Sequence, residues 1–172
     1  RNEENLVRYW AIPGMEGFSH RVGGLEKDNC SGCISTNPDN HELMVRLRQA
    51  KVDNVAKVIP PVVVLGNPDA DLLVVGWGGT FGHLYSAVDE LNNQGHKVAL
   101  AHFNYISPLP ANTEEVLRRY KTVTVCELNN GQFAAYLRSK VQGLTVQQYN
   151  KIEGQPFTVN ELTTYLNTLL AL

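Results

Sequence analysis

A buried strand, a glycine turn and an amphipathic helix follow one another in residues 71–95, DLLVVGWGGTFGHLYSAVDELNNQG. Leu72–Val75 is a continuous apolar run, which is typical of a strand buried on both faces of a parallel sheet. The glycines within Gly76–Gly79 allow the backbone to turn, and Thr80 is placed to cap a helix that ends near Gly95. The apolar side chains of that helix recur at helical spacing, at Leu84, Ala87, Val88 and Leu91. The segment therefore predicts the first strand and helix of a βαβ unit.

Strands and helices continue to alternate on both sides of this segment. We expect further strands at Val62–Leu65, Lys97–Phe103, Thr122–Cys126 and Leu144–Val146. Further helices are expected at 113–120, at 133–141 and from Thr158 onwards, the last with Leu162, Tyr165, Leu166 and Leu169 on its inner face. Asn112 or Thr113 caps the first of these, and Thr158 with Glu161 forms a capping box for the last. This alternation predicts an α/β fold, a three-layer sandwich with a mainly parallel sheet.

The first 60 residues have a different character. Up to residue 36 the periodicity is weak and turn-forming residues are frequent, so we expect an extended arm. Asn37 and Pro38 form a typical helix start, and the helix is expected to run to about Val58, before Pro60 and Pro61. The sequence therefore predicts an arm with a connecting helix at 1–60 and the α/β domain at 61–172.

The composition disfavours several classes of function. With 43% hydrophobic and 19% charged residues, the chain resembles an ordinary globular protein. Its net charge of −2 argues against nucleic-acid binding, which needs a basic surface. No apolar run approaches the roughly 18 residues of a membrane span, and no secretory leader is visible. Three cysteines in 172 residues do not make a disulfide scaffold, so a cytoplasmic location is expected.

The glycine turn invites comparison with dinucleotide-binding loops. Its spacing differs from G-x-G-x-x-G, because Phe81 occupies the position of the third glycine. Such a site also needs an acidic residue after the second strand, where this chain has residues 102–104, His-Phe-Asn. Nucleotide binding is therefore one alternative, and a purely structural turn is the other. Ligands of open α/β sheets bind at the carboxyl ends of strands, so the candidate cofactor-binding residues are Gly78, Gly79, Thr80, Asn129 and Gln132. The polar segment Glu127–Gln132 equally fits helix capping or a subunit contact.

Neither the cysteines nor the histidines form a recognisable reaction centre. Cys30 and Cys33 have C-x-x-C spacing, but a zinc or iron–sulfur site needs about four ligands and no second pair exists. Cys126 is expected on a buried strand, so we predict no metal site and two unpaired thiols on a loop. No serine or cysteine lies at a suitable spacing from the histidines of the α/β region, His83, His96 and His102. We therefore predict no catalytic residue.

Short motifs spread over the whole chain resemble one enzyme family. They are IPG at 12–14, HRVGGLEKD at 20–28, NPDNHELMVRLRQAKV at 37–52, DLLVVGWGGTFG at 71–82, PLPAN at 108–112, ELNNGQ at 127–132 and YNKIEGQPF at 149–157. In this order they resemble the C-terminal part of the α subunit of 2-oxoacid:ferredoxin oxidoreductases, most closely the 2-oxoglutarate type (2-oxoglutarate synthase). The segment DNCSGCI at 28–34 departs from the family, which usually has an acidic turn there without C-x-x-C. No role is therefore carried over to Cys30 or Cys33.

The resemblance implies an activity that depends on other polypeptides. Members of the family convert a 2-oxoacid and coenzyme A to an acyl-CoA, carbon dioxide and reduced ferredoxin, using thiamine diphosphate, Mg²⁺ and a [4Fe–4S] cluster. It implies that these cofactors are held by other parts of the enzyme, so we expect this chain to bind none of them. The implied fold is similar to the transketolase C-terminal domain. The implied partners are the rest of the α subunit and the β subunit, with ferredoxin and coenzyme A acting on the intact complex.

Two functions therefore remain open. The first is a C-terminal domain that contributes to subunit assembly of a thiamine-dependent enzyme making succinyl-CoA, and that is inactive in isolation. The second is a free-standing nucleotide- or small-ligand-binding α/β module that uses the turn at Gly76–Gly82. An assembly role predicts apolar surface that stays exposed where the partners normally sit.

Overall fold

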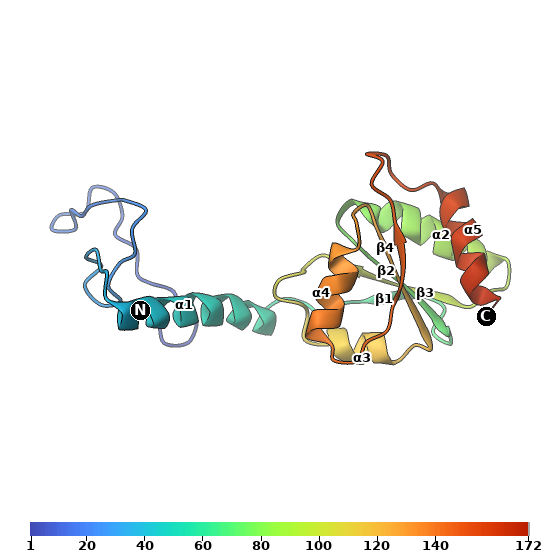
Figure 1. The fold of residues 1–172 in the computed structure, drawn as a ribbon, viewed down its shortest axis with the longest axis horizontal. Coiled ribbons are helices and arrows are strands. Elements are labelled where there is room, and N and C mark those ends of the chain that lie inside the picture. The colour runs from blue at the N-terminus through green and yellow to red at the C-terminus, as the bar shows by residue number, and fades with distance from the viewer. Residues whose placement is uncertain (172) are drawn as a thin grey trace. The chain divides into compact units, whose positions relative to one another are not determined.

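Residues 1–171 are described by a computed structural model, in which the chain divides into two units, Arg1–Val58 and Ile59–Leu172. The second unit is built on a five-stranded sheet in the order β1-β3-β2-β4-β5 (Figure 1). The strands are β1 (Val64–Gly66), β2 (Leu72–Trp77), β3 (Val98–Phe103), β4 (Thr122–Glu127) and β5 (Gln147–Asn150). Only β1 runs antiparallel to its neighbour, and Leu72 of β2 pairs with Val98 on one side and Thr122 on the other. The predicted α/β fold with a mainly parallel sheet is confirmed.

Helices cover both faces of this sheet. Figure 1 shows α2 (Phe81–Asn93) and α5 (Val159–Leu170) together on one face, and α3 (Thr113–Arg118) and α4 (Gln132–Lys140) on the other. Neighbouring residues of a strand point to opposite faces. Leu72 and Val74 therefore pack with the buried side of α2 and α5, while Leu73 and Val75 pack with that of α3 and α4. Strand β2 is apolar at consecutive positions because both of its faces are covered.

Two predicted helix starts use the predicted side chains. Asn37 accepts a hydrogen bond from the backbone N–H of Asn40 at 3.0 Å and begins α1 (Pro38–Asp53), which continues as a 3-10 turn, η1 (Asn54–Lys57). Thr158 and Glu161 form the predicted capping box of α5, with the N–H of Glu161 bonded to the Thr158 hydroxyl at 3.1 Å. The apolar inner face of α5 is also confirmed.

Three other residues do not cap helices as predicted. Thr80 and Thr113 donate their hydroxyls to the carbonyl three residues earlier, at 2.8 and 2.6 Å, so neither side chain caps the helix that follows. Asn112 uses its amide to bond both the backbone N–H and the backbone C=O of Val62, each at 2.9 Å. This partner lies on a distant part of the chain, so local sequence patterns do not reveal it.

Two predicted strands are displaced along the sequence. The strand at Leu144–Val146 is wrong: these residues precede β5, and their apolar side chains pack against the core without joining the sheet. Strand β5 has the polar sequence Gln-Gln-Tyr-Asn and pairs with β4 through its backbone, which a hydrophobic pattern does not detect. The strand predicted at Val62–Leu65 begins later, at Val64, and is the antiparallel edge strand β1.

The first unit consists of an irregular segment, residues 1–36, followed by α1. Within residues 1–36 the regular backbone pairing is an isolated bridge between Lys27 and Ile34. Helix α1 buries one side chain, Met44. Large apolar side chains of the arm are exposed instead, among them Tyr9 at 79%, Trp10 at 84% and Val22 at 88%. Among residues 1–171, none of the helices is both long enough and apolar enough to span a membrane.

A substitution of Gly66, in β1, tests whether the close packing of this strand against β3 excludes a side chain at this position. Its φ of +89° is unfavourable for other residues, and a Cβ atom would lie 2.6 Å from the backbone oxygen of Val98. We expect Gly66→Ala to lower the free energy of unfolding of the second unit by roughly 2–4 kcal/mol, measured by urea denaturation. The matched control is Gly82→Ala in the first turn of α2, where a Cβ meets nothing within 4 Å. It should be neutral or up to about 1 kcal/mol stabilising; equal losses in both variants would contradict the steric account.

The capping box of α5 should make the stability of the fold depend on pH. Lys151 Nζ lies 2.8 and 3.0 Å from the two carboxylate oxygens of Glu161, and together with Thr158 it lowers the pKa of Glu161 to about 2, from a usual value of 4.5. A lowered pKa means that the carboxylate stabilises the fold above its unfolded pKa and that this is lost as the pH falls through the folded one. Glu161→Gln should therefore lower the melting temperature at neutral pH, and its difference from the wild type should shrink as the pH falls from 4.5 towards 2. The exposed control Glu115→Gln should show no such trend in circular dichroism melts.

Candidate functional site

The carboxyl ends of β2, β3 and β4 lie at one edge of the sheet, because these strands run parallel. The turn η2 (Gly78–Thr80) follows β2 and leads into α2. Residues 128–131 follow β4 and lead into α4. Since β2 and β4 are neighbours, the candidate residues Gly78, Gly79, Thr80, Asn129 and Gln132 belong to the same sheet edge. Whether this edge binds a cofactor stays a prediction.

The glycine turn presents backbone to solvent. Gly78 has a φ of +61°, which explains the glycine at this position, and a Cβ atom at Gly78 or Gly79 would meet nothing within 4 Å. Thr80 is buried, and its hydroxyl donates to the carbonyl of Trp77. The turn is therefore open on its outer side, but its one hydroxyl, that of Thr80, already forms a hydrogen bond within the fold.

His102, at the end of β3, braces this turn. Its Nε2 lies 3.1 Å from the carbonyl oxygen of Gly78, so Nε2 carries the proton and donates it to that oxygen. The ring also meets the ring of Phe81 edge-on, with centroids 5.2 Å apart. Burial lowers the pKa of His102, which favours the neutral imidazole. His102 occupies a position where a nucleotide-binding site would need an acidic residue, and here it supports the glycine turn.

Glu127, at the end of β4, is completely buried and caps α4. Its two carboxylate oxygens accept hydrogen bonds from the backbone N–H groups of Phe133 and Ala134, at 3.0 and 3.1 Å. These donors belong to the first turn of α4, where N–H groups have no partner within the helix and favour negative charge. The helix-capping alternative for this segment is confirmed, although the capping residue lies before the loop and not within it.

The loop between β4 and α4 is shaped by Gly131. Its φ is +84°, and a Cβ atom would overlap the side-chain amide of Gln148 on β5. Asn129 accepts a hydrogen bond from the backbone N–H of Asn130 at 3.1 Å, and Gln132 is exposed at the start of α4. The candidate amides Asn129 and Gln132 therefore flank a turn whose geometry is fixed by backbone requirements.

The described residues do not fit an iron–sulfur cluster or an Mg²⁺ site. Within residues 1–171, no three His, Cys, Asp or Glu side chains converge as metal ligands. Cys126 is fully buried, and burial raises the pKa of its thiol to about 12. Cys30 and Cys33 are exposed and unbridged on the arm, where Asp28 accepts hydrogen bonds from the N–H groups of Cys30 and Ser31. A cluster needs about four thiolates, and this cysteine set does not supply them.

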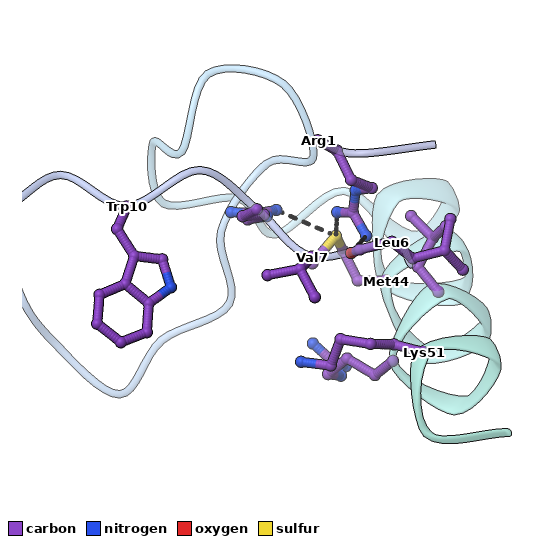
Figure 2. Close-up of a pocket in the computed structure, with 9 residues that line it drawn as sticks. Arg1, Leu6, Val7, Trp10, Met44 and Lys51 are labelled. Carbon is purple, nitrogen blue, oxygen red and sulfur yellow. Dashed lines mark hydrogen bonds between the residues drawn. The ribbon is translucent and has the colours of Figure 1, made fainter. Parts of the chain in front are cut away.

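The arm contains cavities that sequence reasoning did not identify. One of about 210 Å³ lies between the arm and α1, where Met44 contacts residues of the arm (Figure 2). Another of about 620 Å³ lies within the arm and shares Arg1 and Arg8 with the first. The smaller cavity brings residues of α1 against the irregular arm, and the larger one is lined by the arm alone. The arm has no periodic pattern, so the sequence carried no signal that would bring these residues together.

A sequence model of one protein family, described as pyruvate:ferredoxin oxidoreductase core domain II, matches residues 70–162, more than half of the chain. The chain belongs to this family. The matched range of core domain II runs from the start of β2 into α5, so it includes the central strand and the sheet edge described above.

Individual relatives agree with this assignment. The chain is 46% identical over 173 residues to the 2-oxoglutarate oxidoreductase subunit KorA of Mycobacterium tuberculosis, covering 99% of this chain and 26% of the relative. It is 30% identical over 138 residues to the α subunit of 2-oxoacid:ferredoxin oxidoreductase 1 of Aeropyrum pernix, covering 76% of this chain and 22% of that subunit. The predicted resemblance to these α subunits is confirmed. The chain thus spans about a quarter of the length of the relatives it matches.

Solved structures show the same fold. The structure of 2-oxoglutarate:ferredoxin oxidoreductase from Magnetococcus marinus with 2-oxoglutarate, coenzyme A and succinyl-CoA bound matches with a TM-score of 0.86 and 28% identity, over 98% of this chain and 30% of that one. A split-gene transketolase, described as an inactive β4 tetramer, matches with a TM-score of 0.50 and 15% identity, over 66% of this chain and 43% of that one. The second match concerns the fold alone, and it confirms the predicted similarity to transketolase.

Substitutions of Glu127 test whether its buried carboxylate stabilises the start of α4. Glu127→Ala leaves the N–H groups of Phe133 and Ala134 unpaired, so we expect a loss of roughly 2–4 kcal/mol in the free energy of unfolding. Glu127→Gln keeps one acceptor oxygen and should lose about half as much. The control Glu153→Gln removes an exposed charge and should stay within about 0.5 kcal/mol of the wild type. Urea denaturation measures all three, and an unchanged Glu127→Ala variant would contradict the capping role.

Proposed function

We propose that this chain serves as core domain II of the α subunit of a 2-oxoglutarate:ferredoxin oxidoreductase and contributes to subunit assembly. The observation that carries the proposal is 46% identity to the 2-oxoglutarate oxidoreductase subunit KorA of Mycobacterium tuberculosis across 99% of the chain. The match to a 2-oxoglutarate:ferredoxin oxidoreductase over 98% of the chain at a TM-score of 0.86 supports the same assignment.

The assembled enzyme converts 2-oxoglutarate and coenzyme A to succinyl-CoA and carbon dioxide, and the electrons released reduce ferredoxin. As the family resemblance implies, thiamine diphosphate, Mg²⁺ and a [4Fe–4S] cluster are held by other domains and by the β subunit. Within residues 1–171, no three His, Cys, Asp or Glu side chains converge as metal ligands, which supports this part of the proposal. Its location is cytoplasmic, together with the rest of the α subunit, the β subunit and ferredoxin.

The contribution of this chain is structural. At the carboxyl edge of the sheet, the side chains that look functional are engaged within the fold: Thr80 with Trp77, His102 with Gly78, and Glu127 with the start of α4. In the arm, by contrast, large apolar side chains are exposed, and exposed apolar surface of this kind marks protein interfaces. The arm therefore supplies the contact surface, and the α/β unit supplies a rigid body.

The alternative of a free-standing ligand-binding module has one observation in its favour. The glycine turn is open, since a Cβ atom at Gly78, Gly79 or Gly82 would meet nothing within 4 Å. The turn lacks a free hydroxyl and an acidic residue after β3, which a ribose-binding site of this fold needs. These two features favour the assembly role.

Assembly is tested in the full-length α subunit co-expressed with its β subunit. Ile12 and Leu25 of the arm are 62% and 61% exposed, and Ile12→Asp with Leu25→Asp should weaken subunit association about tenfold or more, since a charge would enter an apolar contact. The readouts are the amount of β subunit that co-purifies and the coenzyme A-dependent reduction of ferredoxin by 2-oxoglutarate.

The matched control is Gln142→Asp, which places the same charge at an exposed polar residue of the second unit. It should leave co-purification unchanged. Equal losses in the arm and control variants would contradict an interface in the arm. A complex that turns over pyruvate and not 2-oxoglutarate would contradict the substrate, and turnover by the 172-residue chain alone would contradict an assembly role.

A further inference from the structure

Basic side chains gather around the two cavities of the first unit. The smaller cavity, of about 210 Å³, is lined by Arg1, Arg8, Arg48 and Lys51 among other residues. The larger, of about 620 Å³, shares Arg1 and Arg8 and adds Arg21 and Lys27. No Asp or Glu lines either cavity. This concentration of positive charge occurs in a chain whose net charge is −2, so it does not follow from the composition.

Two of these cations converge on one neutral atom. The guanidinium Nη2 atoms of Arg1 and Arg8 lie 4.0 and 3.4 Å from the sulfur of Met44, which is a weak acceptor. The remaining contacts of both guanidinium groups are also with neutral oxygens, such as Asn29 Oδ1 at 2.7 Å from Arg1 and the backbone oxygen of Asp28 at 3.3 Å from Arg8. The Nε of Arg1 is buried without a hydrogen-bond partner among the described residues. The two positive groups are therefore held close together, and within residues 1–171 neither forms an ion pair with a carboxylate.

The nearby carboxylates are engaged elsewhere. Glu26 binds His41 at 2.6 Å and Arg48 at 3.0 Å. The carboxylate of Asp28 accepts hydrogen bonds from within its own turn, which lower its pKa, with a smaller contribution from the charge of Arg8. Within residues 1–171, no carboxylate lies within ion-pair distance of Arg1, Arg8 or Lys51. A bound anion would relieve the repulsion between these groups.

We propose that this cationic cavity binds the phosphate groups of a ligand of the nucleoside diphosphate class. The planar fork of an arginine matches the geometry of a phosphate, and two such forks beside a lysine suit a diphosphate. Figure 2 shows Lys51 on the α1 side of the hollow and Trp10 on the opposite side. The Trp10 side chain is 84% exposed, which leaves its ring free to stack on a flat base. The larger cavity, of about 620 Å³, lies within the size range of small-molecule sites and shares Arg1 and Arg8 with the smaller one.

The proposed phosphate site lies within the first unit, and its existence does not depend on the proposed assembly role. It is tested by titrating the 172-residue chain with pyrophosphate, ADP and coenzyme A, using calorimetry and tryptophan fluorescence. We expect all three to bind, ADP and coenzyme A more tightly than pyrophosphate, and added salt to weaken the binding. Fluorescence quenching by ADP should disappear in Trp10→Phe, which keeps Trp77 as a reference.

Arg8→Gln and Lys51→Gln should each weaken pyrophosphate binding about tenfold, since each removes a charge-assisted hydrogen bond. The matched control Arg138→Gln removes the same charge from an exposed position on α4 and should change nothing. Lys51 is exposed, and within residues 1–171 its side chain has no hydrogen-bond or ion-pair partner, so its variant is expected to fold even if Arg8→Gln disturbs the arm. Circular dichroism of each variant verifies this.

Several outcomes would overturn the inference. One is the absence of binding by all three phosphate compounds, and another is equal weakening by Arg138→Gln and Lys51→Gln. Tight binding of 2-oxoglutarate without binding of pyrophosphate would show a carboxylate site instead. Loss of ADP binding in Gly79→Val, with normal binding in Lys51→Gln, would show that ADP binds at the glycine turn and not in the arm. Binding of coenzyme A alone, with neither ADP nor pyrophosphate bound, would contradict a site that recognises the diphosphate.

Discussion

Strand β2 contributes Leu73, Val74 and Val75, each completely buried, to both layers of the sandwich. Complete burial of an apolar side chain of this size stabilises a fold by roughly 1.5–3 kcal/mol. Because consecutive residues face opposite sides, both faces of this strand must be covered by helices, and its parallel neighbours β3 and β4 require helical crossovers. Helices α2 and α5 cover one face of this strand and α4 helps to cover the other, so the apolar side chains of β2 are excluded from water on both sides.

The same arrangement brings polar side chains to the carboxyl edge of the sheet, where they form hydrogen bonds with backbone groups of the fold. Glu127 satisfies the first turn of α4, and His102 holds the glycine turn that starts α2. In open α/β sheets this edge commonly binds ligands, and here its buried polar groups are bonded to the backbone instead. This use of the polar groups supports the structural role proposed for the chain.

The arm differs physically from the α/β unit. Helix α1 buries only Met44 among its described side chains, so the arm has little core of its own, and many of its large apolar side chains are exposed. Such a segment gains stability by binding something, either an apolar partner surface or an anion. The assembly role and the phosphate site proposed for the arm both follow from this incomplete burial.

The sequence by itself determined the elements with strong periodicity and local caps: β2, the buried faces of α2, α4 and α5, and the caps at Asn37 and Thr158. Each depends on residues a few positions apart, so a pattern reveals it. Only the tertiary structure decided the rest. It placed the polar strand β5 through backbone pairing, bonded Asn112 to Val62, directed Glu127 to the start of α4, and gathered Arg1, Arg8 and Lys51 around one cavity. These contacts join residues whose proximity arises from folding, because side chains that meet across a folded chain need share no spacing along it.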